Sequence, residues 1–585
     1  MHLACDFECT TTAAPMYTVY LAAIENVETG EQLLFYSMDE FMHYLSTIEP
    51  STLYFHNGVR YDFRFIHWWC FNTGKAYYNI GKNEYLVFKT DKYELTKTGR
   101  IKKHKGKPVP LEIKHKLIDT TSIFKSSIKS LGEVVGIAKG MGTVETPLVA
   151  KYDENTWTEA TRDSFIPKYI THQQTLAEAI KINKWDEYAL YDVKILAEVI
   201  RQFKIIDKIE NHKTTIASIA YSELLQNEEY ANVIKGYDIK ADYIKNLNRI
   251  ARDAYKGGIS WTNPKYANKL MKTKGFHLDY TSMYPSIYMN SEQYPLPTNM
   301  HTNKKTNLYI MQFKNLKCTC KPDKFPLLKQ RSTVISENGQ AYLHEFHGDI
   351  TLTSMEVEYM KENYTNISFD KATKIYYETN YPLMNALREH GEKWFHIKNH
   401  PKTASDRLYA KMMLNTVYGY LGFYDKEIKL YEYHFNSDTK VVEKTLVGTG
   451  VTGINTAEVP AAAFITAYGR VKLANDINKF GIDNVVCCDT DSLFIINYES
   501  LNDFEISEDL GLLKLEHEFD EIISIKPKTY CIAKDGRVVA QALAGSNYQF
   551  KDIKNFKSGQ KHYSKEIEAG VGGVGLKIVE KYLGF

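Results

Sequence analysis

The sequence lacks the features that would direct a chain to a membrane, to a secretory pathway or to a structural zinc site. No apolar run approaches the roughly 18 residues that a membrane-spanning helix needs. The first residues, MHLACDFECT, contain neither the charged segment nor the apolar core of a signal peptide. The eight cysteines include no CxxC pair with a second pair or histidines at metal-binding spacing. We therefore expect a cytoplasmic protein with reduced cysteines, no membrane contact and no structural zinc.

The chain also lacks a large net charge, because 73 basic residues stand against 71 acidic ones and leave a net charge of +2. A nucleic acid would therefore have to bind at a local basic surface, and the overall charge neither favours nor excludes it. Tyrosine is plentiful, since 43 of them raise the aromatic fraction to 13%. Tyrosine stacks on bases and sugars, but half-buried tyrosines in sheets explain the number equally well. At 585 residues the chain is too long for a single core, so we expect at least two domains.

Hydrophobic periodicity divides the chain into two regions. Up to about residue 205, short strand-like runs alternate with helical patterns and end in the strongly periodic segment that begins at Trp185, which predicts one α/β domain. From residue 206 onward, strand-like runs such as NVVCCDTDSLFII alternate with helical segments such as TASDRLYAKMMLNTVYGYL, which favours an α+β organisation. The lysine-rich stretch from Lys97 to Pro110 lies between two strand-like runs, where a solvated hairpin tip is favoured over a DNA-binding surface.

Acidic residues form the most informative pattern of the first region. Asp6 and Glu8 lie in the strand-like run LACDFECT, where alternate side chains share one face, so the two carboxylates point the same way. Two such side chains could also be solvated on an edge strand. Further residues favour a site, because Asp62 lies in LYFHNGVRYDFRFI, and Tyr188 and Asp192 are four apart on one predicted helix face. Together they predict a two-metal hydrolysis site, in which one ion activates water and the other stabilises the leaving oxygen.

A second set of acids lies far along the chain. Asp279 ends the apolar run of GFHLDYTSMYPS, and Asp489 and Asp491 flank Thr490 in VVCCDTDSLF, which predicts a hairpin whose tight turn presents both carboxylates. Transfer of a nucleotide needs two cations to neutralise the charge that develops on the phosphates. Carboxylate oxygens select Mg²⁺ over zinc. The set therefore predicts a second two-metal site, suited to phosphoryl transfer.

A helix between these acids carries a mixed polar and aromatic stripe. Lys411, Asn415 and Tyr418 in KMMLNTVYG fall at positions i, i+4 and i+7, and so on one face. A cation, an amide and an aromatic ring in that arrangement suit the phosphates and the bases of a nucleotide. A surface helix with an accidental polar face is the alternative.

The order of these motifs and the length of the chain resemble the protein-primed family B DNA polymerases of small tailed phages, the phi-twenty-nine-like group. CDFECT, YFHNGVRYD and YALYD resemble the three exonuclease motifs of the family, and DYTSMYPS, KMMLNTVYG and CDTDS resemble polymerase motifs A, B and C. The resemblance implies a ribonuclease-H-like exonuclease domain followed by a right-hand polymerase with two palm insertions. The expected boundaries are 1–205 for the exonuclease, 206–585 for the polymerase, about 303–371 and 422–458 for the insertions, 385–420 for the fingers and 540–585 for the thumb.

The resemblance implies a role for each matching residue of the exonuclease domain. The expected metal ligands, which are also catalytic, are four carboxylates: Asp6, Glu8, Asp62 and Asp192. Tyr188 would orient the attacking water, and Lys139 in GIAKGMG stands where the family has a catalytic lysine. The residues expected to hold the single-stranded 3′ end are His56, Asn57, Tyr61 and Ser122.

The same resemblance assigns residues of the polymerase domain. Asp279 and Asp491 would bind the catalytic metals, assisted by Asp489. Tyr284 would pack under the incoming sugar and exclude a 2′-hydroxyl, so that the enzyme prefers deoxynucleotides. The other residues expected to bind the triphosphate, the base pair or the primer phosphate, some of them in the KxY motif KTY, are Ser282, Met283, Lys398, Lys411, Asn415, Tyr418, Lys528 and Tyr530. AYKGGISW and TAYGR resemble template- and primer-binding motifs, so the residues expected to contact DNA are Tyr255, Gly257, Gly258 and Arg470.

The function implied by the resemblance is template-directed DNA synthesis with 3′→5′ proofreading, with two Mg²⁺ ions in each active site and Mn²⁺ able to substitute. The partners would be template and primer DNA, deoxynucleoside triphosphates and a terminal protein that supplies the priming hydroxyl. The enzyme would be a monomer or a heterodimer with that terminal protein. The two palm insertions imply processive, strand-displacing replication of a linear phage genome in the host cytoplasm.

Three other functions stay open on the sequence. A plasmid-encoded or primer-independent relative would share every catalytic motif and start synthesis differently, although such relatives are usually longer. A non-catalytic DNA-binding scaffold would have lost carboxylates that this chain retains. A stand-alone nuclease would leave the long region beyond Asp192 without a purpose.

Overall fold

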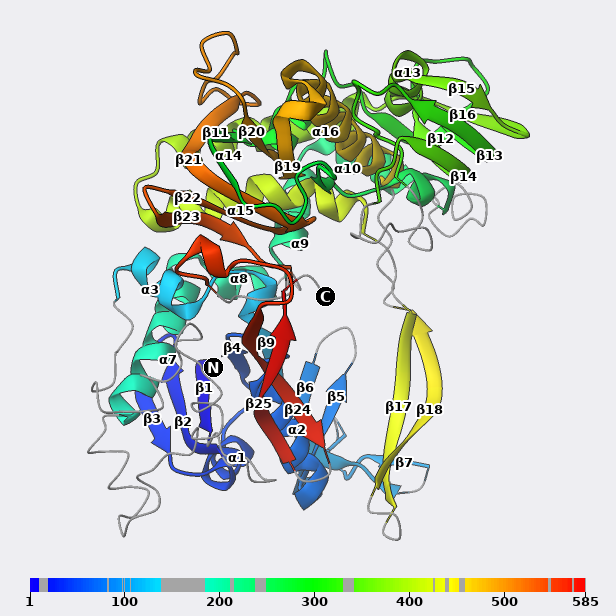
Figure 1. Ribbon diagram of the computed structural model, residues 1–585. Coiled ribbons are helices and arrows are strands. Elements are labelled where there is room, and N and C mark those ends of the chain that lie inside the picture. The colour runs from blue at the N-terminus through cyan, green and yellow to red at the C-terminus, as the bar shows by residue number, and fades with distance from the viewer. Residues whose placement is uncertain are drawn as a thin grey trace.

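In the computed structural model the N-terminal strands and helices gather at one end of the molecule, where the C-terminal hairpin at 561–582 also lies, and most of the helices and strands from residue 216 to 542 lie at the other end (Figure 1). It describes residues 1–9, 19–80, 84–96, 98, 100–105, 107–137, 185–210, 215–236, 249–329, 341–423, 427–436, 441–451, 458–544, 549–570 and 573–583. Within these residues, no helix combines the length and the apolar character that a bilayer crossing requires.

A seven-stranded sheet forms the N-terminal end. Its strands are β1 (His2–Cys9), β2 (Val19–Asn26), β3 (Gln32–Phe35), β4 (Thr52–Phe55), β5 (Ala76–Ile80), β6 (Glu84–Tyr93) and β9 (Pro110–Asp119), in the order β3-β2-β1-β4-β9-β6-β5. The described helices here are α1 (Met38–Thr47), α2 (Asp62–Thr73), α3 (Ile128–Val135), α7 (Trp185–Gln202) and α8 (Ile205–Glu210). The hairpin predicted for the lysine-rich stretch is present between β6 and β9, with a small extra ladder of β7 (Lys103–His104) and β8 (Lys107–Pro108).

The two faces of β1 point to different sets of helices. Leu3, Cys5 and Phe7 belong to the same core cluster as residues of α1 and α2, whereas Ala4 packs in the core that contains α7. Because strand side chains alternate between faces, Asp6 and Glu8 share the face of Ala4. The sheet therefore presents these two carboxylates to α7, which contacts both β1 and β2.

A second seven-stranded sheet lies at the opposite end of the molecule. Its strands are β10 (Ile259–Thr262), β11 (Met271–Tyr280), β19 (Val485–Thr490), β20 (Ser492–Ile496), β21 (Leu513–Lys526), β22 (Thr529–Lys534) and β23 (Arg537–Ala542), in the order β10-β19-β20-β11-β21-β22-β23. The helices around it are α9 (Ile216–Leu224), α10 (Glu228–Gly236), α12 (Met283–Met289), α14 (Tyr381–Asn399), α15 (Ala404–Leu421) and α16 (Val459–Phe480).

Local sequence explains where the two long helices α14 and α15 begin. Asn380 caps α14 through a hydrogen bond from the backbone of Leu383, and a proline occupies its first turn. Thr403 and Asp406 form a capping box at the start of α15. The two helices pack together, and α15 also packs against α9. They occupy the segment expected to form the fingers.

A third sheet of five strands and two hairpins complete the fold. The sheet contains β12 (Pro297–Thr302), β13 (Tyr309–Cys320), β14 (Glu345–Thr353), β15 (Tyr364–Ser368) and β16 (Lys371–Thr379), with α13 (Ser354–Asn363) between β14 and β15. It extends beyond the expected insertion at 303–371, because β12 pairs with β16. The hairpins are β17 (Glu427–Asn436) with β18 (Val441–Val451), and β24 (Lys561–Gly570) with β25 (Gly573–Tyr582), the latter in contact with α2 (Figure 1).

Candidate active sites

Three of the four carboxylates predicted in the first region lie together. Asp6 and Glu8 project from one face of β1, and Asp192 comes from α7, with Tyr188 one turn earlier on the same helix. One carboxylate oxygen from each of Asp6, Glu8 and Asp192 lies within 4.8 Å of the other two. We call these three residues the first carboxylate cluster. Oxygen donors at this spacing fit a hard divalent cation such as Mg²⁺.

Asp62, the fourth predicted ligand, begins α2 and is 1% exposed. Its Oδ1 atom has no hydrogen-bond partner among the described residues. Burial raises the pKa of Asp62 well above its ordinary value, and the charges of Asp119 and Glu8 raise it further. A buried carboxylate near other carboxylates is stabilised when a cation neutralises it, so Asp62 fits a place at the edge of the first carboxylate cluster.

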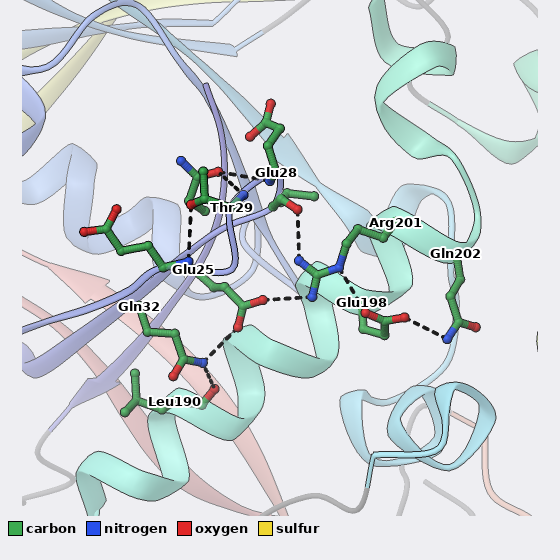
Figure 2. Close-up of polar contacts among 11 residues, drawn as sticks. Glu25, Glu28, Thr29, Gln32, Leu190, Glu198, Arg201 and Gln202 are labelled. Carbon is green, nitrogen blue, oxygen red and sulfur yellow. Dashed lines mark hydrogen bonds and ion pairs between the residues drawn. The ribbon is translucent and has the colours of Figure 1, made fainter.

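A polar network fixes the C-terminal half of α7 against the sheet (Figure 2). Arg201 donates to Glu25 on β2 and to Glu198 one turn earlier on α7, each at 2.9 Å. Glu25 is 3% exposed and accepts a further hydrogen bond from Gln32 at 2.8 Å. Because Asp192 lies on the same helix, the network sets its position relative to β1.

The sequence reasoning missed a carboxylate that holds the loop expected to bind a single-stranded end. Asp119, the last residue of β9, accepts the backbone N–H of Asn57 at 3.1 Å and that of Val59 at 3.0 Å. Asn57 has a φ of 72°, which turns the chain after β4. The parallel pairing of β4 with β9 places Phe55 opposite Asp119 and so brings the two strand ends together. Asp119 could have been identified only from the pairing of β4 with β9, because no local sequence motif marks it.

The other residues expected to hold the 3′ end belong to the same loop region. The ring nitrogens of His56 bond to the segment that follows β9, at 2.9 and 2.7 Å. The Ser122 hydroxyl donates to the carbonyl of Asp119 at 2.7 Å. The ring of Tyr61 packs edge-on against a phenylalanine of α2. Lys139 lies outside the described residues.

The acids predicted in the second region come together on adjacent strands. The hairpin predicted around Thr490 is present, since β19 and β20 are antiparallel and Asp489 lies opposite Ser492. Across the other edge of β20, Ser492 lies opposite Asp279 on β11. Thr490 has a φ of 64° in the turn that leads to Asp491. We call Asp279, Asp489 and Asp491 the second carboxylate cluster.

Burial and, after it, mutual repulsion raise the pKa values of two acids in the second carboxylate cluster. Burial and then the charge of Asp491 raise the pKa of Asp279 to about 7. Burial and then the charge of Asp489 raise the pKa of Asp491. Half-buried carboxylates that repel one another in this way would be neutralised by divalent cations, which fits the predicted two-metal site.

One cation already contacts this cluster. Lys528 lies in the turn between β21 and β22, and its Nζ donates to Oδ1 of Asp489 at 2.5 Å. The hydroxyl of Ser260, on β10, donates to the same oxygen at 2.7 Å. Tyr530 packs against Phe494, with ring centroids 4.5 Å apart. The KxY segment thus forms one wall of the second carboxylate cluster.

Basic side chains of α14 and α15 also lie near the second carboxylate cluster, and we call them its helical wall. Lys398 on α14 donates to the hydroxyl of Ser282 at 2.8 Å. Burial lowers the pKa of Lys398, and the charges of Lys411 and Lys514 lower it further. Several cations that repel one another beside a hydroxyl suit a polyanionic ligand. The side chain of Met283 is 1% exposed and packs in the core, so the expected nucleotide contact of Met283 stays a prediction for its backbone.

Two tyrosines form a closely packed floor next to the acids. Tyr284 is 9% exposed and packs against Tyr418, with ring centroids 4.6 Å apart. A Cβ atom at Gly258 would lie 3.1 Å from the Tyr284 hydroxyl and 2.8 Å from a side-chain carbon of Thr490. Asn415 is exposed on the predicted face of α15. The backbone at Gly258 therefore lies close to the Tyr284 hydroxyl, and any side chain at position 258 would crowd it.

Arg470 does not reach the surface, which corrects the expected contact with primer DNA. Its side chain is 2% exposed and forms an ion pair with Glu356 at 2.7 Å. It also donates to the backbone carbonyls of Lys256 and Gly257. The physical reason is that α16 is buried along most of its length, so a polar residue on it faces the interior. The motif TAYGR by itself does not reveal this burial.

The segment expected to bind template, together with Arg252 just before it, anchors the end of α15. Arg252 donates to the carbonyls of Gly422 and Phe423 at 2.9 and 3.1 Å. A Cβ atom at Gly422 would lie 2.4 Å from the ring of Tyr255. Glycine at position 422 is therefore required for this close contact.

Comparison with known proteins gives the family. Residues 46–507 match the model of the family described as DNA polymerase type B, organellar and viral. The DNA polymerase of Bacillus phage M2 is 25% identical over 557 residues, which cover 90% of this chain and 86% of that protein. The DNA polymerase of Bacillus phage phi29 is 24% identical over 582 residues, which cover 94% and 90%.

Solved structures agree along the whole chain. Phi29 DNA polymerase complexed with single-stranded DNA covers 100% of this chain, with a TM-score of 0.71 and 18% identity. The same polymerase complexed with primer-template DNA and incoming nucleotide substrates also covers 100%, with a TM-score of 0.68 and 19% identity. In each case 99% of the phi29 chain is covered. The expected fold class, the resemblance to phi-twenty-nine-like enzymes and the prediction of a DNA-directed DNA polymerase are confirmed. This chain belongs to the family of type B DNA polymerases of organelles and viruses.

Proposed function

We propose that this polymerase extends DNA at the second carboxylate cluster and removes mismatched 3′ ends at the first carboxylate cluster. The observation that carries the proposal is the separation of two carboxylate groups on two different sheets. Synthesis and hydrolysis of the same bond require different attacking groups, a primer hydroxyl and a water. Separate clusters allow each attacking group to have its own surroundings.

The side chains around the second carboxylate cluster match the parts of a deoxynucleoside triphosphate. Lys398 and Lys411, on α14 and α15, would hold the phosphates. Tyr284 would support the sugar, because Tyr418 packs against its ring and the backbone at Gly258 lies close to its hydroxyl. A 2′-hydroxyl would collide with a ring held in this way, so we expect a preference for deoxynucleotides.

The donor chemistry of both clusters supports Mg²⁺, with Mn²⁺ as a substitute, since each offers several carboxylate oxygens. When bound, divalent cations would neutralise the phosphate oxygens and activate the attacking oxygen. Tyr188 would orient the attacking water in the first cluster through its place one turn before Asp192. Lys528 would neutralise the primer-terminal phosphate from its position beside Asp489.

We also propose that a terminal protein supplies the priming hydroxyl and that replication of a linear phage genome proceeds by strand displacement. Support comes from the phage relatives, which align with about 90% of this chain. The five-stranded sheet and the β17–β18 hairpin occupy the two segments where palm insertions are expected. In Figure 1 the β17–β18 hairpin projects from the helical part as a separate ribbon, as expected of an element that closes around DNA.

Paired substitutions test the two-site proposal. Asp489→Ala with Asp491→Ala should abolish nucleotide addition and leave degradation of single strands. Asp6→Ala with Asp62→Ala should remove degradation and spare addition. Loss of both activities in either double variant would contradict separate sites.

A primed single-stranded circle, offered without helicase or clamp, tests processivity and strand displacement. Products much longer than one circle are expected, and products that stop at one circle would count against an encircling insertion. Synthesis that begins without any terminal protein or primer would favour the primer-independent alternative.

A further inference from the structure

We propose that Glu356, which lies outside both carboxylate clusters, is a positioning residue that holds Tyr284 in place for selection of the incoming sugar. The proposal rests on the role proposed above for the second carboxylate cluster. Glu356 acts through two cations, Arg470 and Lys256, and we call these three residues the Glu356 cluster. It joins α13, α16 and the segment that precedes β10.

Glu356 is an ionised carboxylate in the interior. Its side chain is 2% exposed and accepts hydrogen bonds from Arg470 at 2.7 and 3.2 Å. The backbone and hydroxyl of Thr353 donate to its other oxygen at 3.0 and 2.9 Å. Burial opposes ionisation, but the charges of Arg470 and Lys256 lower the pKa of Glu356 to about 2. Both of its oxygens are therefore engaged, and its charge offsets two cations.

Arg470 transmits the position of Glu356 to the loop at residues 256–258. While its Nε and Nη2 atoms bind Glu356, its Nη1 atom donates to the carbonyls of Lys256 and Gly257. Lys256 is tied in turn to the five-stranded sheet, because its Nζ donates to the carbonyl of Thr351 at 2.9 Å. The loop is thus held by side-chain contacts from both sides.

This loop and α16 both bring a glycine backbone close to Tyr284. Gly258 follows directly after the carbonyls that Arg470 binds, and a Cβ atom there would lie 3.1 Å from the Tyr284 hydroxyl. Gly469, the neighbour of Arg470 on α16, is as close, since a Cβ atom there would lie 3.0 Å from the ring of Tyr284. A small shift of either element therefore changes the space available to Tyr284.

Neutralising Glu356 would leave Arg470 and Lys256 without their shared counter-charge. Arg470 is buried, whereas Lys256 is already partly exposed, so the uncompensated charge of Arg470 is the unfavourable one. We therefore expect Arg470 to shift together with the loop at 256–258 that it holds. Gly258 would then withdraw from the Tyr284 hydroxyl. The ring would gain room to move aside, and a ribonucleotide would be admitted more readily.

The test is the ratio of kcat/KM for a deoxynucleotide to that for the matching ribonucleotide, measured on one preparation of Glu356→Gln. The fraction of folded enzyme affects both kcat/KM values equally and cancels in their ratio. If Glu356 only stabilised the fold, the ratio would therefore be unchanged. We expect the ratio to fall on the order of tenfold, because a displacement of Tyr284 by less than an ångström is enough to change the selection of the sugar by about that factor. Glu356→Asp keeps the charge and should retain most of the ratio.

Glu362→Gln is the matched control, because Glu362 lies on the same helix and is exposed. It should leave the ratio unchanged. Hydrolysis of single strands should also be unchanged per folded molecule in Glu356→Gln, because the first carboxylate cluster lies on a different sheet.

An unchanged ratio in Glu356→Gln overturns the proposal. Tyr284→Ala, measured in the same assay, tests the sugar-selecting role of Tyr284 separately. A reduced ratio in Tyr284→Ala supports that role even if Glu356→Gln has no effect. An unchanged ratio in Tyr284→Ala contradicts it. If Glu356→Gln does not fold, Arg470→Lys takes its place. Lysine keeps the charge but cannot bind Glu356 and the loop at once, so the same fall in the ratio is expected.

Discussion

Lys528 and Asp489 are joined by a hydrogen bond of 2.5 Å from Nζ to Oδ1, so the cation expected at the primer terminus lies against an acid of the second carboxylate cluster. The pair links the turn before β22 with the end of β19. Ser260 donates to the same oxygen. Lys528 therefore neutralises Asp489 in the free enzyme and is in place to meet a phosphate that approaches the cluster.

Replacing Lys528 with methionine should lower polymerisation and spare hydrolysis of single strands. The variant loses a charge-assisted contact, worth about 1.5–3 kcal/mol and so roughly 10- to 100-fold in kcat/KM for primer extension. Lys534→Met is the control, since Lys534 lies at the far end of β22 in an exposed pair with Glu518. Equal losses in the two variants would contradict a specific role for Lys528.

Replacing Arg201 with methionine should weaken the exonuclease more than the polymerase. The ion pair with Glu25 holds the helix that carries Asp192, and Glu25 would be left buried without its cation. Because Arg201 is partly exposed, we expect a loss of about 1–3 kcal/mol in the free energy of unfolding. Adding Glu25→Gln to Arg201→Met removes the unpaired buried charge, so the double variant should regain part of the lost stability, measured by thermal unfolding. If the losses of stability of the two single variants simply add in the double variant, Arg201 and Glu25 do not act as a pair.

Replacing Lys398 with alanine should raise the KM for the incoming nucleotide by about tenfold, as expected for the loss of one charged contact. The affinity for primer-template should not change, because Lys398 lies on the helical wall beside Ser282. Lys393→Ala is the control on the same helix, where the side chain pairs with Glu223 instead. Steady-state kinetics with varied nucleotide distinguish the two, and a KM unchanged in Lys398→Ala would refute the assignment.

Replacing Glu458 with glutamine should remove a pH-dependent loss of stability. Glu458 is fully buried at the start of α16, and burial raises its pKa from 4.5 to about 8. Between those values the folded protein holds a proton that the unfolded chain releases, so the stability that this group contributes is complete below pH 4.5 and is lost as the pH rises towards 8.

The variant should therefore gain stability at pH 8, on the order of 1–3 kcal/mol, and little at pH 5. Unfolding midpoints at both pH values measure the difference, with the exposed Glu499→Gln as the control. A gain that is the same at pH 5 and pH 8 would contradict the raised pKa.

The elements that hold the catalytic groups were predictable because their signals are local. Alternation in LACDFECT placed Asp6 and Glu8 on one face, and helical periodicity predicted α7 and α15. The acids on either side of Thr490 indicated the turn between β19 and β20. Each of these patterns lies within one strand, helix or hairpin and depends little on the rest of the chain.

The residues that hold the sites together were not predictable in this way. Asp119 is found only through the pairing of β4 with β9, and Arg201 only through its contact with a strand far away in the sequence. Arg470 was expected to meet DNA, but it faces Glu356 because α16 is buried. Burial of a helix depends on what packs around it, and a single helix does not encode that.

The sequence by itself determined which chemical groups are available and that the acids form two sets. Only the tertiary structure decided which side chains meet across strands, which cations are exposed, and which residues support Tyr284 from behind. The physical reason is the range of the interactions. Periodicity and turn preference act over a few residues, whereas ion pairs and close packing join segments that only the complete fold brings together.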